Sequence, residues 1–304
     1  MNARLLLCST LTVGVLGLVA CDSAEAPDPY ANDRESAEPM ERAADAPDDI
    51  HSALQAAADG DHRSDANRAR NRYRNPVETL AFFGLEANHT VIEIWPGGGW
   101  YTEVLAPVLR DRGTLVAANF PVDPEGGMTS RMGQALLDKL QGNPEIYDQV
   151  EVIGFMPPDM ASLGETGSAD LVLLPRALHN LMARGAHVDV LEASFDVLRP
   201  GGVLGVIQHR LPADRDFDPE ERTGYVPEAA VIEAAEAAGF VLDGSAEINA
   251  NPLDTADHPM GVWSLPPNLR ACQGLDDEAE ASACREQFEA IGESDRMTLR
   301  FKKP

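Results

Sequence analysis

Short apolar runs alternate with amphipathic stretches through most of the chain after residue 89. Runs rich in Val, Ile and Leu, which predict buried strands, occur at residues 90–94, 114–118, 149–153, 170–174 and 203–207. Apolar residues at helical spacing follow most of them, over residues 101–109, 131–140, 188–198 and 228–238. Residues 240–250 and 296–301 are further strand candidates and complete a set of seven. Strands that alternate with helices predict an α/β fold whose mostly parallel sheet has helices on both faces.

Two further segments, residues 50–84 and the insertion at residues 251–292, lie outside this alternating pattern. One helical stretch begins near Ile50, and another begins near Pro76, because proline suits a first helical turn and Gly84 supplies a stop. A Pro-rich insertion covers residues 251–292, between the last two strand candidates. Structureless loops of that length are uncommon in compact domains, so the insertion is expected to be functional or separately stapled. We therefore expect one domain over residues 50–304.

The first 20 residues have the pattern of an export signal. Arg4 precedes an uncharged, mostly apolar run, which is shorter than the ~20 apolar residues of a spanning helix. The run ends in Leu18-Val19-Ala20-Cys21, which resembles the lipobox cleaved by bacterial lipoprotein signal peptidase. That resemblance implies a signal peptide at residues 1–20, lipidation of Cys21, and a domain anchored to the cell envelope and facing the periplasm. The alternative is an ordinary cleaved signal with an incidental Cys21, which also exports the domain.

The segment after the signal and the remaining cysteines agree with export. Residues 21–49 are rich in Ala, Pro, Asp and Glu and lack periodic apolar positions, which is typical of a disordered acidic tether. Cys272 and Cys284 are an isolated pair, which in an oxidising compartment predicts a disulfide that closes a small loop. Neither cysteine has a Cys-x-x-Cys partner or a histidine beside it, so no metal site is expected there.

The charge balance limits the expected partners. The chain has 24 basic and 50 acidic residues and a formal net charge of −26. A field of that sign repels nucleic acid and anionic lipid surfaces, so we expect no nucleic-acid partner. A local basic cluster, formed by Arg68, Arg70, Arg72 and Arg74, predicts a solvated helix face rather than a polyanion site.

A glycine turn follows the first predicted strand. Glu93-Ile94-Trp95-Pro96-Gly97-Gly98-Gly99 places an acid, then glycines, before a helix start. Glycines let a ligand approach the backbone closely, and a helix start offers free N–H groups, so the stretch indicates a nucleotide-cofactor site. The dinucleotide fingerprint is excluded because its third glycine is missing at the required spacing, and no lysine follows as in a phosphate loop.

The same stretch resembles the first motif of class I S-adenosylmethionine-dependent methyltransferases, acid-x-Gly-x-Gly-x-Gly. Residues 169–173 resemble the fourth-strand motif of that family, and residues 198–204 resemble its fifth-strand turn. The resemblance covers roughly residues 65–304 and implies a Rossmann-like, seven-stranded methyltransferase sheet with S-adenosylmethionine as methyl donor. The cofactor contacts that it implies are Glu93, Gly97, Gly98, Gly99, Asn119 and Asp159.

A narrower resemblance links the chain to a group of exported bacterial predicted methyltransferases. It rests on Arg72-Tyr73-Arg74-Asn75-Pro76, the turn at residues 95–101, Leu178-His179-Asn180, and the segments 251–252 and 257–263. It implies the same fold and cofactor class, and it names no substrate.

Two positions depart from the family pattern. Trp95 stands where the motif has its first glycine, so the turn must be built differently or the pocket must be narrower. Asn119 ends the second strand, where the family usually places an acid on the ribose hydroxyls. An amide can accept one hydrogen bond there but carries no charge. Both departures bear on the affinity for the cofactor.

The position of polar residues after central strands selects the candidates for chemistry. Ligands bind beyond the carboxyl ends of the strands in an open parallel sheet. Arg176, His179 and Asn180 follow the fourth strand, and His209 follows the fifth. Methyl transfer needs an aligned nucleophile and sometimes a base for its proton, so His179 is the first candidate base and His209 the second. The alternative for each is a hydrogen-bonded structural histidine. Arg176 and Asn180 are candidate substrate contacts.

A second polar cluster lies in the insertion and includes Asp254, Asp257 and His258, with Trp263 nearby. Turn chemistry is the first interpretation, because Asn, Asp and Pro dominate turns for backbone reasons. A lid that supplies substrate contacts is the second. A metal site shared with His179 or His209 is the third.

These observations predict S-adenosylmethionine-dependent methyl transfer to a small molecule or an envelope component. The main objection is the compartment, because the methyl donor is made in the cytoplasm. The alternative is a non-catalytic module on the same fold that binds a small ligand or serves the envelope. A metal-assisted hydrolase that uses His179, His209 and Asp257 is a third option.

Overall fold

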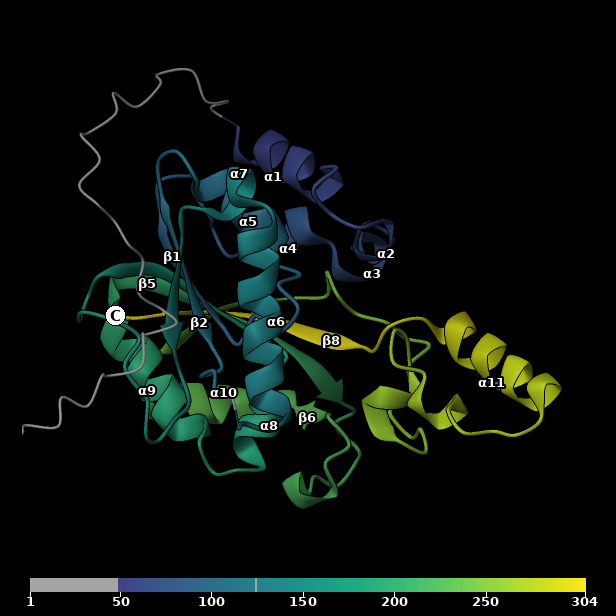
Figure 1. The fold of residues 1–304 in the computed structure, drawn as a ribbon. Coiled ribbons are helices and arrows are strands. Elements are labelled where there is room, and N and C mark those ends of the chain that lie inside the picture. Colours follow the sequence, from purple (N-terminus) through teal and green to yellow (C-terminus); the bar gives the residue numbers. More distant parts are fainter. Residues whose placement is uncertain (1–48, 124) are drawn as a thin grey trace, which may run out of the picture. The chain divides into compact units, whose positions relative to one another are not determined.

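Figure 1 shows the fold in a computed structural model, which describes residues 49–123 and 125–304. The predicted signal peptide, Cys21 and the tether up to residue 48 lie outside the described residues. The strands are β1 (Thr90–Ile94), β2 (Thr114–Asn119), β3 (Val150–Gly154), β4 (Ala169–Pro175), β5 (Leu198–Leu211), β6 (Val226–Pro227), β7 (Val241–Ala246) and β8 (Arg296–Lys302). The helices are α1 (Ile50–Asp59), α2 (Asp65–Arg68), α3 (Asn71–Arg74), α4 (Pro76–Phe82), α5 (Thr102–Leu109), α6 (Met128–Gly142), α7 (Pro144–Tyr147), α8 (Leu178–Met182), α9 (His187–Val197), α10 (Glu228–Ala237) and α11 (Glu278–Ile291), with short 3-10 helices η1 (Pro219–Glu221), η2 (Gly261–Ser264) and η3 (Arg270–Cys272).

A sheet of eight strands organises this part of the chain, one strand more than the sequence predicts. The order is β3-β2-β1-β4-β5-β8-β7, and the additional two-residue strand β6 pairs with the end of β5. Strands β1 to β5 are parallel to one another. The predicted class, an α/β fold with a mostly parallel sheet, is confirmed.

Strand β8 runs antiparallel to both β5 and β7, between which it lies. The dinucleotide-binding sheet has the order 3-2-1-4-5-6 with parallel strands, so the reversed β8 separates this sheet from that fold. Reversal also has a local consequence. The first residue of β8 lies at the carboxyl end of β5, where Arg296 pairs in register with His209.

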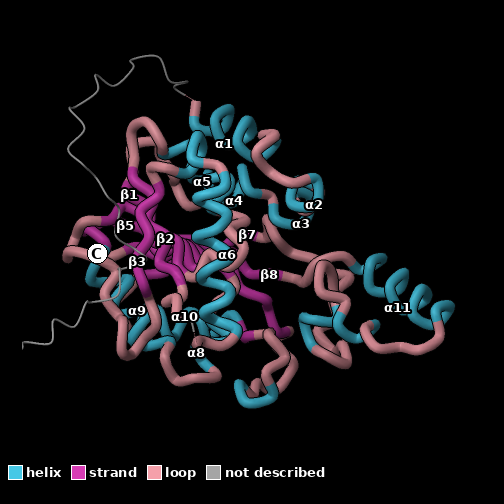
Figure 2. The backbone as a smooth tube through the Cα atoms, viewed as in Figure 1, coloured by secondary structure: helices cyan, strands magenta, loops and turns pink. Residues whose placement is uncertain are grey.

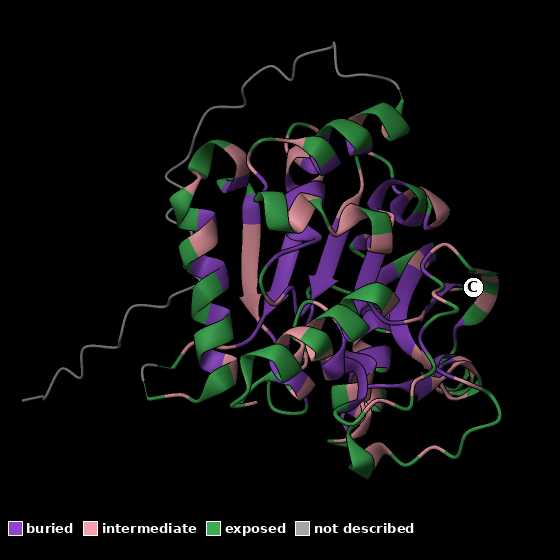
Figure 3. Cartoon of the chain, turned by 90° about the vertical axis from the view of Figure 1, so that its right-hand side faces the viewer, coloured by how far each residue is buried: buried purple, intermediate pink, exposed green. Residues whose placement is uncertain are grey.

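Helices cover both faces of the sheet, as the alternating strand residues require (Figure 3). On one face, Ile92 and Ile94 of β1 belong to the core that α8, α9 and α10 close. On the other face, Val91 belongs to a second core with α1, α4, α5 and α6. Continuous burial of β4 on both sides explains its run of apolar residues. The two cores together hold the carboxyl ends of the central strands in fixed positions.

The segment from α2 to α4 connects to the far end of the chain. The side-chain amide of Asn75 donates to the carbonyl of Ile248 at 2.6 Å, and Nη1 of Arg296 donates to the carbonyl of Tyr73 at 3.1 Å. Pro76 begins α4, as the sequence predicts. These contacts hold α3 beside the start of β8.

The insertion between β7 and β8 has its own structure. It contains α11, which Asp277 caps by accepting a hydrogen bond from the backbone N–H of Glu280. The predicted disulfide is present, because Cys272 of η3 and Cys284 of α11 are bonded with a Cα–Cα distance of 5.6 Å. In Figure 2 α11 lies at the side of the molecule, away from the sheet. No helix among residues 49–123 and 125–304 is long and apolar enough to span a membrane.

Candidate functional site

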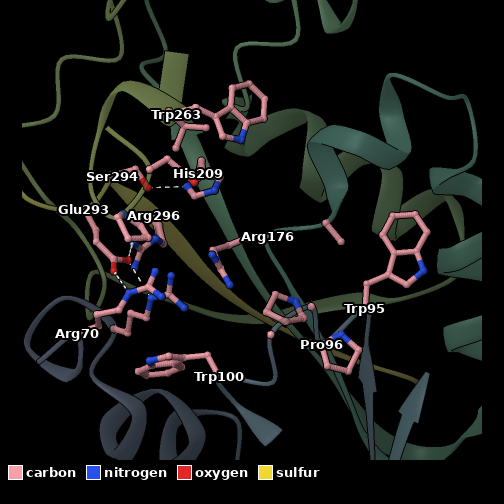
Figure 4. Close-up of a pocket in the computed structure, with 18 of the residues that line it drawn as sticks. Arg70, Trp95, Pro96, Trp100, Arg176, His209, Trp263, Glu293, Ser294 and Arg296 are labelled. Atoms are coloured by element: carbon pink, nitrogen blue, oxygen red, sulfur yellow. Dashed lines mark hydrogen bonds and ion pairs between the residues drawn. The ribbon is translucent and has the colours of Figure 1, made fainter. Parts of the chain in front are cut away.

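A cavity of about 380 Å³ lies at the carboxyl ends of the central strands, within the usual range for small-molecule sites. The loops after β1, β2 and β4 line it, together with the start of β8, residues of α3 and part of the insertion. His209 also lines it, from within β5 rather than after that strand as the sequence predicted. Figure 4 shows an arginine-rich side of the cavity and, across it, Trp95 and Pro96. The cavity is therefore where ligand binding is expected in an open parallel sheet.

The glycine turn after β1 forms one wall. Gly97 and Gly99 adopt left-handed backbone conformations with φ of 59° and 73°. A Cβ atom added at Gly98 would meet nothing within 4 Å, and one at Gly97 would meet only Cε of Met132 at 3.9 Å. Gly97 and Gly98 line the cavity, whereas a Cβ at Gly99 would lie 3.1 Å from Leu136 of α6. The turn is thus open to a ligand at Gly97 and Gly98.

Trp95 forms the turn without the glycine that the family motif has at its position. Its φ is 49°, so the backbone keeps the left-handed conformation of the motif. That conformation is strained for a bulky side chain such as tryptophan. The indole Nε1 donates to the carbonyl of Phe155 at 2.9 Å, and the ring lies 4.8 Å from that of Phe120. The turn is therefore retained, and the Trp95 ring is directed toward the ends of β2 and β3.

Glu93 and Asn119 are buried and do not line the cavity. Thr102 Oγ1 donates to the Glu93 carboxylate at 2.6 Å, and burial raises the pKa of Glu93 to about 7. The Asn119 amide donates to the carbonyl of Gly133 at 3.0 Å, while its Oδ1 is buried without a partner in the described part of the chain. Asp159 is exposed and does not line the cavity. The predicted contacts of Glu93, Asn119, Asp159 and Gly99 with a cofactor stay predictions.

The two candidate histidines lie together in the wall of the cavity. The ring centroids of His179 and His209 are 5.6 Å apart. Burial lowers the pKa of His179 to about 4, and burial with the neighbouring His179 and arginine charges lowers the pKa of His209 well below its usual value. Gln208 Nε2 lies 3.3 Å from Nδ1 of His179, and Ser294 Oγ lies 2.5 Å from Nδ1 of His209. Both imidazoles are therefore neutral at pH 7 and positioned by neighbours.

Four arginines meet on the side of the cavity that faces Trp95 and Pro96 (Figure 4). Arg70 and Arg74 come from the N-terminal helical segment, Arg176 follows β4, and Arg296 begins β8. Glu293 accepts from Nε of Arg70 at 2.5 Å and from Nε of Arg74 at 2.8 Å, and it also accepts from Nη2 of Arg296. Burial alone would raise the pKa of Glu293, but the three guanidinium charges lower it to about 2.

The prediction that the N-terminal arginines form a solvated face is wrong for two of them. Arg74 is only 2% exposed, and both it and Arg70 line the cavity. Arg72 is exposed, as predicted, and stacks on Tyr73. The spacing explains the difference, because residues four apart share one face of a helix and the residue between them points elsewhere.

The polar cluster of the insertion makes turn contacts. Asp254 accepts hydrogen bonds from the Tyr225 hydroxyl at 3.0 Å and from the backbone N–H of Asp295 at 2.8 Å, and it pairs with His258 at 2.9 Å. Asp257 is exposed and bonds to Thr255. None of Asp254, Asp257 and His258 lines the cavity, and no three His, Cys, Asp or Glu side chains in the described ranges are grouped to hold a metal.

Asn180 and Trp263 also line the cavity, and their role as substrate contacts stays a prediction. Sequence reasoning missed Arg70, Arg74, Glu293, Ser294 and Arg296. Glu293, Ser294 and Arg296 could have been found from the rule that ligands bind beyond the carboxyl ends of parallel strands. For an antiparallel strand such as β8, the residues at that edge of the sheet are the ones at its start. Because β8 starts where β5 ends, residues just before β8 reach the same edge as His209.

The fold of the chain is similar to the folds of solved methyltransferase structures. No protein-family model matches the chain, and no curated protein matches its sequence. The solved structure of the [4+2]-cyclase SpnF matches with a TM-score of 0.51 at 16% identity, covering 84% of this chain and 93% of that one. Geranyl diphosphate C-methyltransferase from Streptomyces coelicolor A3(2) matches with a TM-score of 0.50 at 13% identity, covering 82% and 86%.

The chain has the class I methyltransferase fold. A third match, Haemonchus contortus phosphoethanolamine N-methyltransferase 2, has a TM-score of 0.50 at 14% identity and covers 76% of this chain and 53% of that one. One of the three is by name a cyclase, so the fold by itself does not set the reaction.

Proposed function

We propose that the protein transfers a methyl group from S-adenosylmethionine to a small molecule or an envelope component. The observation that carries the proposal is a glycine turn that opens onto a cavity at the carboxyl ends of β1, β4 and β5. The resemblance of residues 93–99 to the first methyltransferase motif and the fold of the comparison structures support it.

The residues of the cavity fit this cofactor at the turn. Gly97 and Gly98 would hold it through their backbone, because no side chain or backbone atom fills the space where a Cβ of Gly98 would point. Trp95 and Phe120 offer ring surface beside the turn. When bound, S-adenosylmethionine supplies an electrophilic methyl group.

His179 is the residue that takes the proton of the acceptor group. Burial lowers its pKa to about 4, which keeps the imidazole neutral at pH 7 and also makes it a weaker base than a solvated histidine. Gln208 positions the ring at Nδ1, and proton acceptance at Nε2 requires the tautomer that carries the ring proton on Nδ1, with the side-chain oxygen of Gln208 rather than its Nε2 facing that atom. Trp263 packs beside this imidazole, with its ring 5.8 Å from that of His179.

We expect S-adenosylhomocysteine to bind the wild-type domain with micromolar affinity in calorimetric titration. Gly98→Leu should weaken that binding about tenfold or more, because the new side chain enters the cavity. Gly98 has no positive φ, so the substitution adds no left-handed strain.

Gly142→Leu is the matched control. A Cβ at Gly142 also meets nothing within 4 Å, and the residue ends α6 outside the cavity. Its affinity for S-adenosylhomocysteine should equal that of the wild type. A folded wild-type protein that binds neither S-adenosylhomocysteine nor S-adenosylmethionine would contradict the proposed function.

A non-catalytic binding module is the second candidate function. The burial of Asn119 and the Trp95–Phe120 contact favour it, because they occupy the strand ends where the family places ribose contacts. Such a module would bind a ligand in the arginine-rich part of the cavity and show no affinity for S-adenosylhomocysteine in the same titration.

We further propose that the domain is exported and held on the cell envelope by lipidated Cys21, as in the exported group that it resembles. The disulfide between Cys272 and Cys284 supports an oxidising compartment. Metabolic labelling with a radioactive fatty acid should label the wild type and Cys8→Ser, and should fail with Cys21→Ser. Equal labelling of all three proteins would exclude Cys21 as the anchor.

A further inference from the structure

The cavity carries a local charge opposite to that of the whole protein. Its charged lining residues are Arg70, Arg74, Arg176, Arg296 and Glu293, so four guanidinium groups face one carboxylate. The excess of three positive charges lies in a chain whose formal net charge is −26. A buried excess of one sign costs free energy unless a ligand of the other sign neutralises it.

Arg176 is the arginine without a counter-ion. Its guanidinium makes no hydrogen bond and no ion pair with any residue in the described ranges. Figure 4 shows it pointing toward the other arginines of the cavity rather than away from them. Its backbone has φ of 56°, an unusual conformation for a long side chain, and its N–H is held by the carbonyl of Ile207 at 2.6 Å. Strain and unpaired charge at one cavity residue are typical of a binding position.

The other arginines keep unused donors. Nη1 of Arg74 and Nε of Arg296 are buried without a hydrogen-bond partner in the described part of the chain. Each guanidinium has five N–H donors, and Glu293 uses only some of them while it fixes the planes of Arg70, Arg74 and Arg296. The carboxylate thus orients three arginines and leaves donors for a further anion.

We propose that the cavity binds the phosphomonoester group of a substrate between Arg176 and the Glu293-bound arginines. The assignment of this molecule as a substrate rests on the proposed methyl transfer, whereas the binding itself does not. A phosphomonoester carries about −1.5 to −2 charges at pH 7 and three strong acceptor oxygens, which match the charge excess better than one carboxylate. The planar forks of arginine suit phosphate oxygens.

Trp100 and Trp263 set the surroundings of such a group. Trp100 lies under the guanidinium of Arg74, 4.9 Å from Cζ to the ring centroid, and Trp263 lines the cavity beside His179. Trp100 is buried and supports the guanidinium of Arg74, whereas Trp263 offers aromatic surface to the rest of the molecule. The carboxylate of the cofactor is a competing ligand for the arginines. Titration with and without S-adenosylhomocysteine distinguishes that carboxylate from a phosphomonoester.

The test is calorimetric titration of methyl phosphate into the folded domain at pH 8, before and after saturation with S-adenosylhomocysteine. We expect binding in both cases, and binding weakened about tenfold or more in Arg176→Asn. Asn tolerates left-handed backbone, so the variant removes the charge without adding strain. Acetate should bind more weakly than methyl phosphate, because it carries a single charge.

Arg222→Asn is the matched control, since Arg222 also has a left-handed backbone, with φ of 51°, but is exposed outside the cavity. It should bind methyl phosphate like the wild type. Unchanged binding by Arg176→Asn, or displacement of methyl phosphate by S-adenosylhomocysteine, would overturn the proposal. Failure of S-adenosylhomocysteine alone to bind would contradict only the methyl transfer.

Vesicles that contain phosphatidic acid distinguish a lipid headgroup from a soluble phosphomonoester. Arg176-dependent binding of vesicles or of methyl phosphate supports the proposed phosphate site, and the absence of binding to both overturns it.

Ligand-free thermal unfolding gives a second readout. Removing the unpaired charge should raise the Tm of Arg176→Asn by about 2–4 °C, the shift expected for a small gain in a domain of this size. A lower Tm would instead indicate a structural role for Arg176.

Discussion

Glu293→Gln is expected to lower the free energy of unfolding by about 3–5 kcal/mol at pH 7, the usual loss when a buried ion pair loses one partner. The carboxylate is 3% exposed and binds Arg70, Arg74 and Arg296 together. The glutamine keeps the shape of the side chain and leaves the buried guanidinium groups of Arg74 and Arg296 and the partly buried one of Arg70 without their counter-ion. Unfolding in guanidinium chloride, followed by circular dichroism, measures this loss of free energy.

The pH dependence of that loss follows from the lowered pKa of Glu293. The ordinary value is 4.5 and the folded value is about 2, so the stabilisation is complete above pH 4.5 and is lost as the pH falls toward 2. The difference between wild type and Glu293→Gln should therefore shrink over that range. Glu278→Gln is the control, because Glu278 is exposed and pairs only with the partly exposed Arg285. A loss below about 1 kcal/mol in Glu293→Gln would show that the arginines are not held by this carboxylate.

Most of the sheet could be predicted because its strands are buried on both faces. Such strands have continuous apolar runs, and β1 occupies the predicted residues 90–94. The pattern is weaker where burial is one-sided or brief. Strand β5 extends from Leu198 through the Arg-Pro-Gly-Gly turn, and two-residue β6 has no periodicity to detect. Helix α11 was missed because few of its side chains are buried, with Ala281 and Phe288 as the inner contacts.

The candidate site was predicted only as far as the strand-end rule reaches. That rule identified Arg176, His179 and His209, which do line one cavity. It could not identify Arg70 and Arg74 as cavity residues, because their carboxylate partner Glu293 lies more than 200 residues away in the sequence. Alternate arginines along a short segment look solvated until the tertiary partner of one face is known. Trp95 is a comparable case. The motif identifies the position where tryptophan replaces a glycine, but it does not specify the direction in which the indole points.

The second large effect is expected at Glu93, beneath the glycine turn. Burial raises the pKa of this carboxyl group from 4.5 to about 7, so the folded protein keeps it protonated where the unfolded chain ionises. The stability from this group is complete below pH 4.5 and is lost as the pH rises through about 7. The total is about 3 kcal/mol, from 1.36 kcal/mol for each unit of pKa shift.

Glu93→Gln should remove this pH dependence, because a glutamine can still accept the hydrogen bond from Thr102 and does not ionise. The variant should therefore be more stable than the wild type at pH 8, by about 3 kcal/mol in denaturant unfolding, and should resemble it at pH 4.5. Glu236→Gln, an exposed substitution on α10, should show no such difference between the two pH values.

The same experiment bears on the charge of the cavity. Arg176 is one of the groups that lower the pKa of Glu93, against the larger effect of burial. In the Arg176→Asn background the wild-type Glu93 should thus titrate at a higher pH, and the stability loss should move in the same direction. If Glu93→Gln instead destabilised the protein equally at pH 4.5 and pH 8, Glu93 would be ionised in the folded state. An ionised Glu93 would supply a counter-charge near Arg176, reduce the positive excess in the cavity, and favour a singly charged ligand over a phosphomonoester.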